Sequence, residues 1–254
     1  MAHIDWLLLA GGLVTGLLSG LLGIGGGIVM VPLLLAHGVS YHDAVATSSF
    51  AIVLISWFGT IQNFRRGSIQ TKDVLVMGAA GLGTAALGAA LVPLIEKAWL
   101  ELAFAALLFL ALYLNQVEER LLEHPPTQPP AGAARPYLLL IGGCGGFLAG
   151  LIGVGGGVIM VPLQLLFLNR GIKEAVRNSL GVVAISSLAA SVNHGLAHSI
   201  LYQQGLVLGG TGILGAQLSL HVLPRLPDRI VRLAFGCLMV GIAGNFLRLA
   251  WVDW

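Results

Sequence analysis

The chain has 254 residues, of which 57% are hydrophobic and only 9% are charged, and its formal net charge is +2. Soluble globular domains carry about 25% charged residues, so the composition excludes that class. Apolar runs of about 20 residues, the length that crosses a bilayer as a helix, follow one another almost without pause. The sequence therefore predicts an all-α integral membrane protein that is embedded in the lipid bilayer. It predicts no nucleic-acid partner, because the basic residues form no continuous face.

The first apolar segment, residues 7–36, is interrupted by glycine. It contains "GLLGIGGGIVMVPL", from Gly20 to Leu33, with three consecutive glycines. Each glycine costs a continuous helix about 1 kcal/mol relative to alanine, so the pattern predicts a break. Three uninterrupted apolar segments follow, at 44–64, 73–95 and 98–117.

The second half of the chain repeats this order. "GLIGVGGGVIMVPL", from Gly150 to Leu163, lies in a segment at 137–168, and its uninterrupted segments are expected at 175–197, 205–223 and 230–250. An offset of 130 residues aligns the glycine motifs, and an offset of 131 then aligns the following segments as far as Pro93 and Pro224. One register over this length indicates an internal duplication. The expected parts of this single transport domain are a first repeat at 1–117, a proline-rich linker at 118–136 and a second repeat at 137–254.

The basic residues distinguish two topologies for the glycine-broken segments. If each segment crosses the membrane, the 13 Lys and Arg residues divide six to seven between the two sides. If each segment enters and turns back, eleven share one side and only Lys97 and Arg248 lie on the other. The positive-inside rule favours the second arrangement. We therefore predict two inverted-topology repeats, each a glycine-broken re-entrant helical hairpin plus three transmembrane helices. Both termini would lie outside and the linker in the cytoplasm.

The two glycine triplets form the predicted substrate site. Helices that begin near Ile28 and Val158 would present unpaired N–H groups and the positive ends of helix dipoles close to the middle of the membrane. Two such ends, brought together, would bind an anion without a buried Lys or Arg. Pro32 and Pro162 are expected in the first turns, where a missing N–H costs little. The alternative is that the triplets only allow close helix packing.

Polar side chains in the uninterrupted segments form a second group of candidates. Thr47 and Ser48 in the first half match Asn178 and Ser179 in the second, and these groups either donate to an anion or cap their helices. Farther along the same segments, four residues either line the pathway or make interfacial hydrogen bonds: Gln62, Asn63, Asn193 and His194. A histidine there could also carry a proton, although an interfacial role is the preferred interpretation.

Other residues are expected to have structural roles. Gly12, Gly16 and Gly20 have the spacing of helix-packing glycines. Cys144 and Cys237 lie in apolar segments and are expected to pack there, a transient thiol contact with a sulfur-containing substrate being the alternative. No acidic residue lies deep in an apolar segment, which argues against a cation pump. Because no catalytic pair, metal-ligand cluster or nucleotide motif is found, we expect neither an enzyme nor a cofactor nor a metal site.

The paired "GxGGGxxMVPL" motifs, each followed by an "A-V-x-[TN]-S" element, resemble the sulfite exporter TauE/SafE family, also called the toluene-sulfonate uptake permeases. The resemblance covers nearly the whole chain. It implies transport of a small sulfur-containing oxyanion, such as sulfite or an organosulfonate, across the bacterial or archaeal inner membrane. Its motifs select as substrate-binding candidates Gly23, Gly25, Gly26, Gly27, Thr47, Ser48, Gly153, Gly155, Gly156, Gly157, Asn178 and Ser179.

The expected function is therefore export of such an anion by alternating access. Two alternatives remain open at this point: a passive anion channel, and an uptake permease for thiosulfate or a sulfonate. The substrate is the expected small-molecule partner, and a homodimer is an open alternative for the assembly. The sequence leaves the coupling ion undetermined.

Overall fold

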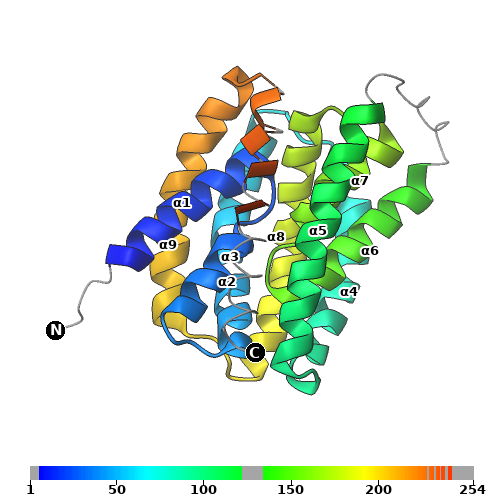
Figure 1. Ribbon diagram of the computed structural model, residues 1–254. Coiled ribbons are helices and arrows are strands. Elements are labelled where there is room, and N and C mark those ends of the chain that lie inside the picture. The colour runs from blue at the N-terminus through cyan, green and yellow to red at the C-terminus, as the bar shows by residue number, and fades with distance from the viewer. Residues whose placement is uncertain are drawn as a thin grey trace.

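The structure, a computed structural model, describes residues 6–121, 134–227, 229–231, 233–234, 236–237 and 240–241. All secondary structure in these ranges is helical (Figure 1). The elements are α1 (Trp6–Leu22), α2 (Gly27–Ala36), α3 (Tyr41–Arg65), α4 (Thr71–Leu91), η1 (Val92–Leu94), α5 (Lys97–Leu121), α6 (Ala134–Ile152), α7 (Gly157–Leu168), α8 (Ile172–Leu196), α9 (Tyr202–Val222) and η2 (Leu223–Arg225).

Five helices in the described ranges are long and apolar enough to cross a membrane. They are α3, α4 with η1, α6, α8, and α9 with η2. The prediction of an all-α integral membrane protein is confirmed. Four of these helices match uninterrupted segments expected from the sequence, and α5 covers a fifth, 98–117. Of the sixth, 230–250, the structure describes only short helical pieces up to residue 241, and most of the linker lies outside the described residues.

Both glycine-rich segments consist of two helices separated by four residues. α1 ends at Leu22 and α2 begins at Gly27, and in the second half α6 ends at Ile152 and α7 begins at Gly157. The residues before α2 and α7, Gly26 and Gly156, have φ angles of 89° and 73°. This left-handed backbone costs a residue with a Cβ about 1–2 kcal/mol. The interruption predicted from the glycine triplets is therefore observed in both halves.

The two prolines of the motif lie deeper in their helices than expected. Pro32 and Pro162 are inside α2 and α7, at the sixth residue of each rather than in the first turn. The reason is that both helices already begin at the last glycine of the triplet. Because proline has no N–H, the carbonyl groups of Ile28 and Val158 lose the usual partner four residues ahead.

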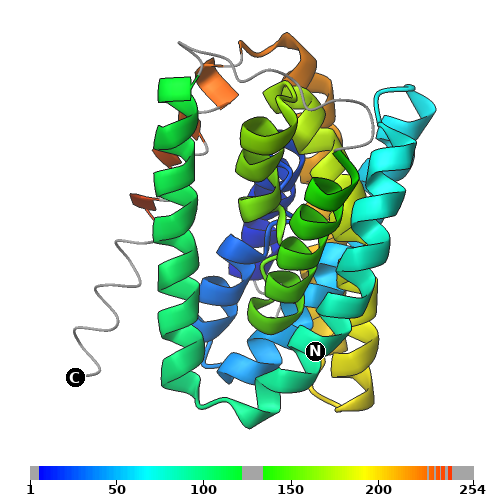
Figure 2. The same cartoon turned by 90° about the vertical axis from the view of Figure 1, so that its right-hand side faces the viewer.

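The halves are joined by equivalent pairs of helices. α1 packs along α9, α4 packs along α6, and α3 packs against α8 (Figure 1). Under the sequence alignment α1 corresponds to α6 and α9 to α4, so the first two pairs are counterparts. α5 lies along one edge of the bundle, where it packs on α7 (Figure 2).

Glycines of α1 make the close contact with α9. A Cβ on Gly16 would collide with the backbone of Gly212, and one on Gly146 in α6 would collide with Gly81 in α4. The two contacts are equivalent, because the repeat alignment pairs Gly16 with Gly146 and Gly81 with Gly212. Gly12 and Gly20 also face α9 without room for a Cβ. The expected packing role of the Gly12, Gly16 and Gly20 series is confirmed.

Candidate functional site

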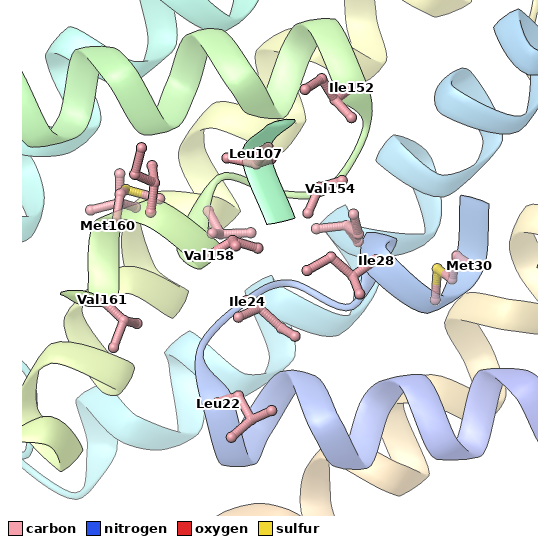
Figure 3. Packing of buried hydrophobic residues seen from close by; sticks show 14 of the residues in the cluster. Leu22, Ile24, Ile28, Met30, Leu107, Ile152, Val154, Val158, Met160 and Val161 are labelled. Atoms are coloured by element: carbon pink, nitrogen blue, oxygen red, sulfur yellow. The ribbon is translucent and has the colours of Figure 1, made fainter. Parts of the chain in front are cut away.

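The two helix breaks lie against each other inside the molecule (Figure 3). A Cβ built on Gly25 would lie 3.3 Å from the Cα of Gly155, and a Cβ on Gly27 would collide with the carbonyl group of Gly153. Every residue from Gly23 to Gly27, and from Gly153 to Gly157, is buried. The structure therefore brings both glycine triplets together in the interior. Their tight contacts show that close packing is part of their role.

Backbone N–H groups in these breaks have no partner among the described residues. Within the described ranges, the amides from Ile24 to Ile28 donate no hydrogen bond, and neither do those from Val154 to Val158. More than about 90% of buried N–H groups in proteins are paired. Five consecutive exceptions in each half, at the starts of two helices, form a concentrated set of donors. Such donors, reinforced by the helix dipoles, favour negative charge.

The side chains between the breaks are apolar. Ile24, Ile28, Val154 and Val158 are fully buried there (Figure 3). Across the described ranges, the buried polar side chains include no Lys, Arg, Asp or Glu. Electrostatic interactions are stronger in such a medium of low dielectric constant than in water. The main-chain amides are consequently the dominant positive groups at this point.

Ser48 connects α3 to the break of the other half. Its Oγ donates to the carbonyl oxygen of Gly153 over 2.9 Å. Ser179, at the equivalent position, accepts a 2.7 Å hydrogen bond from Nε2 of Gln164. Gln164 is fully buried, and its Oε1 has no partner in the described part of the chain. The sequence analysis did not identify Gln164 as a candidate. It could have been noticed as an isolated amide side chain in the apolar run of α7.

Thr47 and Asn178 hold the starts of two helices. The Thr47 Oγ1 accepts a hydrogen bond from the N–H of Leu201, just before α9, and the Asn178 Oδ1 accepts one from the N–H of Gln70, just before α4. Each distance is 3.0 Å. The contacts are equivalent, because the repeat alignment pairs Thr47 with Asn178 and Gln70 with Leu201. These two oxygens therefore satisfy backbone donors of the opposite half.

The four pathway candidates differ in their contacts. Nε2 of His194 lies 3.3 Å from the carbonyl oxygen of Gly150, and Asn193 donates to a carbonyl of its own helix. Asn63 Nδ2 and Gln62 Oε1 are buried and have no hydrogen-bond partner among the described residues. The first-half pair thus retains polar atoms that a solute could engage.

Two hydroxyl groups that the sequence reasoning overlooked lie beside the first break. Thr15 and Ser19, one turn apart on α1, are fully buried, and their oxygens have no partner among the described residues. A Cβ on Gly26 would collide with Cγ2 of Thr15 and lie 3.6 Å from Cβ of Ser19. The signal in the sequence was a pair of hydroxyl residues spaced by four just before the glycine motif.

The two cysteines are the remaining candidates. Cys144 is half-buried and Cys237 is exposed, and neither forms a disulfide. In the described ranges, no group of three or more His, Cys, Asp or Glu side chains could hold a metal ion.

Several membrane-spanning helices around two broken ones define a multi-pass membrane protein, and unpaired amides of the described residues lie where the breaks meet. The chain belongs to the sulfite exporter TauE/SafE family, whose model matches residues 8–246. Similar proteins include probable membrane transporter proteins of Methanocaldococcus jannaschii (25% identity, 96% of this chain and 95% of the relative), Bacillus subtilis (28%, 90% and 94%) and Xylella fastidiosa (28%, 96% and 94%). No solved structure matches the chain.

The family and these relatives identify the protein as a membrane transporter rather than an enzyme. That part of the prediction, and the resemblance on which it depended, are confirmed.

Proposed function

We propose that the protein exports a small sulfur-containing oxyanion, such as sulfite or an organosulfonate, across the inner membrane of a bacterium or archaeon. The observation that carries this proposal is the set of unpaired, buried N–H groups where the two helix breaks meet. A site made of main-chain donors binds an oxyanion without a buried cation. The family description, sulfite exporter TauE/SafE, supports a sulfur-containing oxyanion as the substrate.

The same proposal includes re-entrant hairpins and inverted repeats. α2 and α7 have 10 and 12 residues, so they extend about 15–18 Å, roughly half of the hydrocarbon core. Contacts between loops support this topology. Arg170, just after α7, pairs with Asp73 at the start of α4, and Nη2 of Arg66 lies 3.3 Å from Nε2 of His221 at the end of α9. If the broken segments crossed the membrane, the members of each pair would lie on opposite sides of about 30 Å of hydrocarbon.

Burial of the breaks favours a carrier over a channel. All residues from Gly23 to Ile28 and from Gly153 to Val158 are buried, so in this conformation the proposed site is closed to water. A carrier passes through such an occluded state as one repeat moves against the other. A passive anion channel and an uptake permease for thiosulfate or a sulfonate are the alternatives that the experiment must separate.

Flux measurements in proteoliposomes test the proposal. The wild-type protein is expected to give saturable sulfite flux that is accelerated by sulfite on the opposite side of the membrane, and sulfonates or thiosulfate should compete if they share the site. Flux that does not saturate would support a channel, and net uptake against an outward gradient would support a permease. Movement of a cation without any of these anions would overturn the proposal.

Glycine variants test the location of the site. Gly26→Ala is expected to abolish flux, because the new Cβ meets Thr15 and strains a left-handed residue at the helix start. Gly38→Ala is the matched control: its φ is 76° but nothing lies within 4 Å of the added Cβ. It should bear a similar backbone cost and keep its flux. Wild-type flux in a folded Gly26→Ala protein would show that the anion does not bind at this helix break.

A further inference from the structure

The two helix breaks are surrounded by different side chains, although the backbone around them is equivalent. The offset of 130 residues that aligns the glycine motifs pairs Thr15 with Gly145 and Ser19 with Ala149. The first break therefore has two hydroxyl groups beside it, and the second has none at these positions. We infer that the oxyanion binds on one side only, at the start of α2, where Thr15 and Ser19 complete its coordination. This inference rests on the proposed function.

The hydroxyl groups of Thr15 and Ser19 behave differently from others in the bundle. Within a helix, a Ser or Thr side chain commonly donates to the carbonyl four residues earlier. Ser56, Thr84 and Ser186 do so here, over 2.6, 3.0 and 3.1 Å. Thr15 and Ser19 do not, and both oxygens are buried without a partner in the described part of the chain. Leaving a buried hydroxyl unpaired is unfavourable, so these two groups are suited to a ligand.

The position of these groups relates them to the start of α2. The Thr15 side chain occupies the space that a Cβ on Gly26 would need, and the Ser19 Cβ lies 3.6 Å from that point. Gly26 is the last residue before α2, and the unpaired amides of Gly27 and Ile28 follow it. The side chains that carry the two hydroxyl groups thus lie beside the residue that precedes α2, where the Thr15 methyl group and the Ser19 Cβ are among the nearest atoms. An anion with several oxygens can accept from both hydroxyl and amide donors, and such charge-assisted hydrogen bonds are the strong ones.

The start of α7 is closed in a different way. A Cβ on Gly156 would collide with the carbonyl oxygen of Gly145, whereas the corresponding carbonyl of Thr15 lies 3.2 Å from the Cβ position of Gly26. A carbonyl oxygen repels an anion, and the Gly145 carbonyl is closer to its helix start than the Thr15 carbonyl is to the other. A second carbonyl lies equally close to both helix starts, that of Gly153 at Gly27 and that of Gly23 at Gly157, so it does not distinguish them. On its other side Gly145 adjoins the side chain of Met160, which is apolar. The second helix end therefore packs closely against α6 and serves as the structural counterpart of the first.

Sulfite is the probe for the test, in proteoliposomes that hold the full-length protein. Thr15→Val and Ser19→Ala each remove one donor with little change in shape, and each is expected to raise the KM for sulfite about tenfold with little effect on the maximal rate. Thr15→Ser keeps the hydroxyl and should retain the wild-type KM. Thr84→Val and Ser186→Ala remove hydroxyls that bind their own helix, and their KM should not change.

Thermal stability in detergent is a second measurement, and it distinguishes a hydroxyl that binds the anion from one that stabilises the fold. Without anion, Thr15→Val should be as stable as the wild type or more so, because an unpaired buried hydroxyl is replaced by a methyl group. Saturating sulfite should stabilise the double variant, Thr15→Val with Ser19→Ala, less than it stabilises the wild type. A loss of stability in anion-free Thr15→Val, or a wild-type KM in the double variant, would overturn the inference and leave the proposed function standing. Absence of sulfite flux in the wild type would instead remove both.

Discussion

Two adjacent serines in α3 are equally buried but differ in their hydrogen bonds. Ser49 Oγ donates to the carbonyl oxygen of Val45 in its own helix. Ser48 Oγ also lies within 2.9 Å of that oxygen, and in addition reaches the carbonyl oxygen of Gly153 in the other half. Both side chains are almost completely buried. Of these two serines, Ser48 is therefore the one that joins α3 to the break of the opposite repeat.

Ser48→Ala is expected to lower the free energy of unfolding by about 1–3 kcal/mol, because it leaves the buried carbonyl of Gly153 without its donor. Ser49→Ala should cost less than about 1 kcal/mol, since the carbonyl of Val45 retains other donors. Denaturant titration of the two variants in mixed micelles would measure the difference. Equal losses would show that the contact between the halves contributes little.

At the residue scale, the sequence predicted what depends on local backbone and missed what depends on tertiary contacts. The positive φ of Gly26 and Gly156 was foreseeable, because three consecutive glycines are costly unless the backbone needs them. Thr15, Ser19 and Gln164 were not foreseeable as neighbours of the breaks. A hydroxyl or amide in an apolar helix indicates a polar contact, but it does not indicate which neighbouring helix supplies it.

Among the loops, an ion pair holds the start of α4 to the segment between α7 and α8. Arg170 pairs with Asp73, and also with Glu174 over 2.9 Å. The Arg170 and Asp73 side chains are 26% and 16% exposed. Lys97 and Glu101 form a different kind of pair, within one helix and 57% and 33% exposed. The first pair connects the two repeats, whereas the second lies along α5.

Asp73→Asn is expected to lower the free energy of unfolding by about 1–2 kcal/mol, because a partly buried Arg170 loses one of its two carboxylates. Glu101→Gln should cost at most about 0.5 kcal/mol, as exposed pairs within a helix do. Asp73→Asn combined with Arg170→Gln should cost less than the sum of the two single losses, because both changes remove the same ion pair. The unfolding free energies of the wild type, the two single variants and the double variant form the test. Additive losses in the double variant would contradict a direct interaction.

The expected elements were largely correct, and their ends were less so. α3, α4, α8 and α9 match the expected segments because long apolar runs of this length have no stable alternative in a bilayer. α5 continues to Leu121 and α6 begins at Ala134, so helices extend into the predicted linker from both sides. Composition marks where the apolar run stops, but a helix can continue beyond the hydrocarbon into water.

At the scale of the whole molecule, matched helix pairs follow from the duplication. α1 with α9 and α4 with α6 are equivalent contacts, and α3 with α8 places counterpart helices side by side. The register of the sequence alignment predicted which segments correspond. It could not predict that each broken segment would pack on the other repeat, because no pattern within one segment identifies its partner.

Cysteine accessibility would test the proposed topology. In a protein with Cys144 and Cys237 replaced by alanine, single cysteines would be placed at exposed positions at the ends of the membrane helices or between them: Lys72, Glu96, Gln203 and Arg225. An impermeant thiol reagent should label Lys72→Cys and Arg225→Cys only from the cytoplasmic side, and Glu96→Cys and Gln203→Cys only from the outer side. Labelling of Lys72→Cys and Arg225→Cys from opposite sides would show that the broken segments cross the membrane.

In the proposed mechanism, main-chain N–H groups at the first helix break hold the oxyanion. Selenite, the heavier analogue of sulfite, allows the most direct measurement, because anomalous diffraction from crystals soaked in it locates selenium. We expect a selenium peak about 3–4 Å from the amide nitrogens of Gly27 and Ile28, within hydrogen-bond reach of the anion's oxygens. A peak elsewhere in the membrane region, or none there at a selenite concentration that saturates flux, would show that the anion does not bind at this helix break.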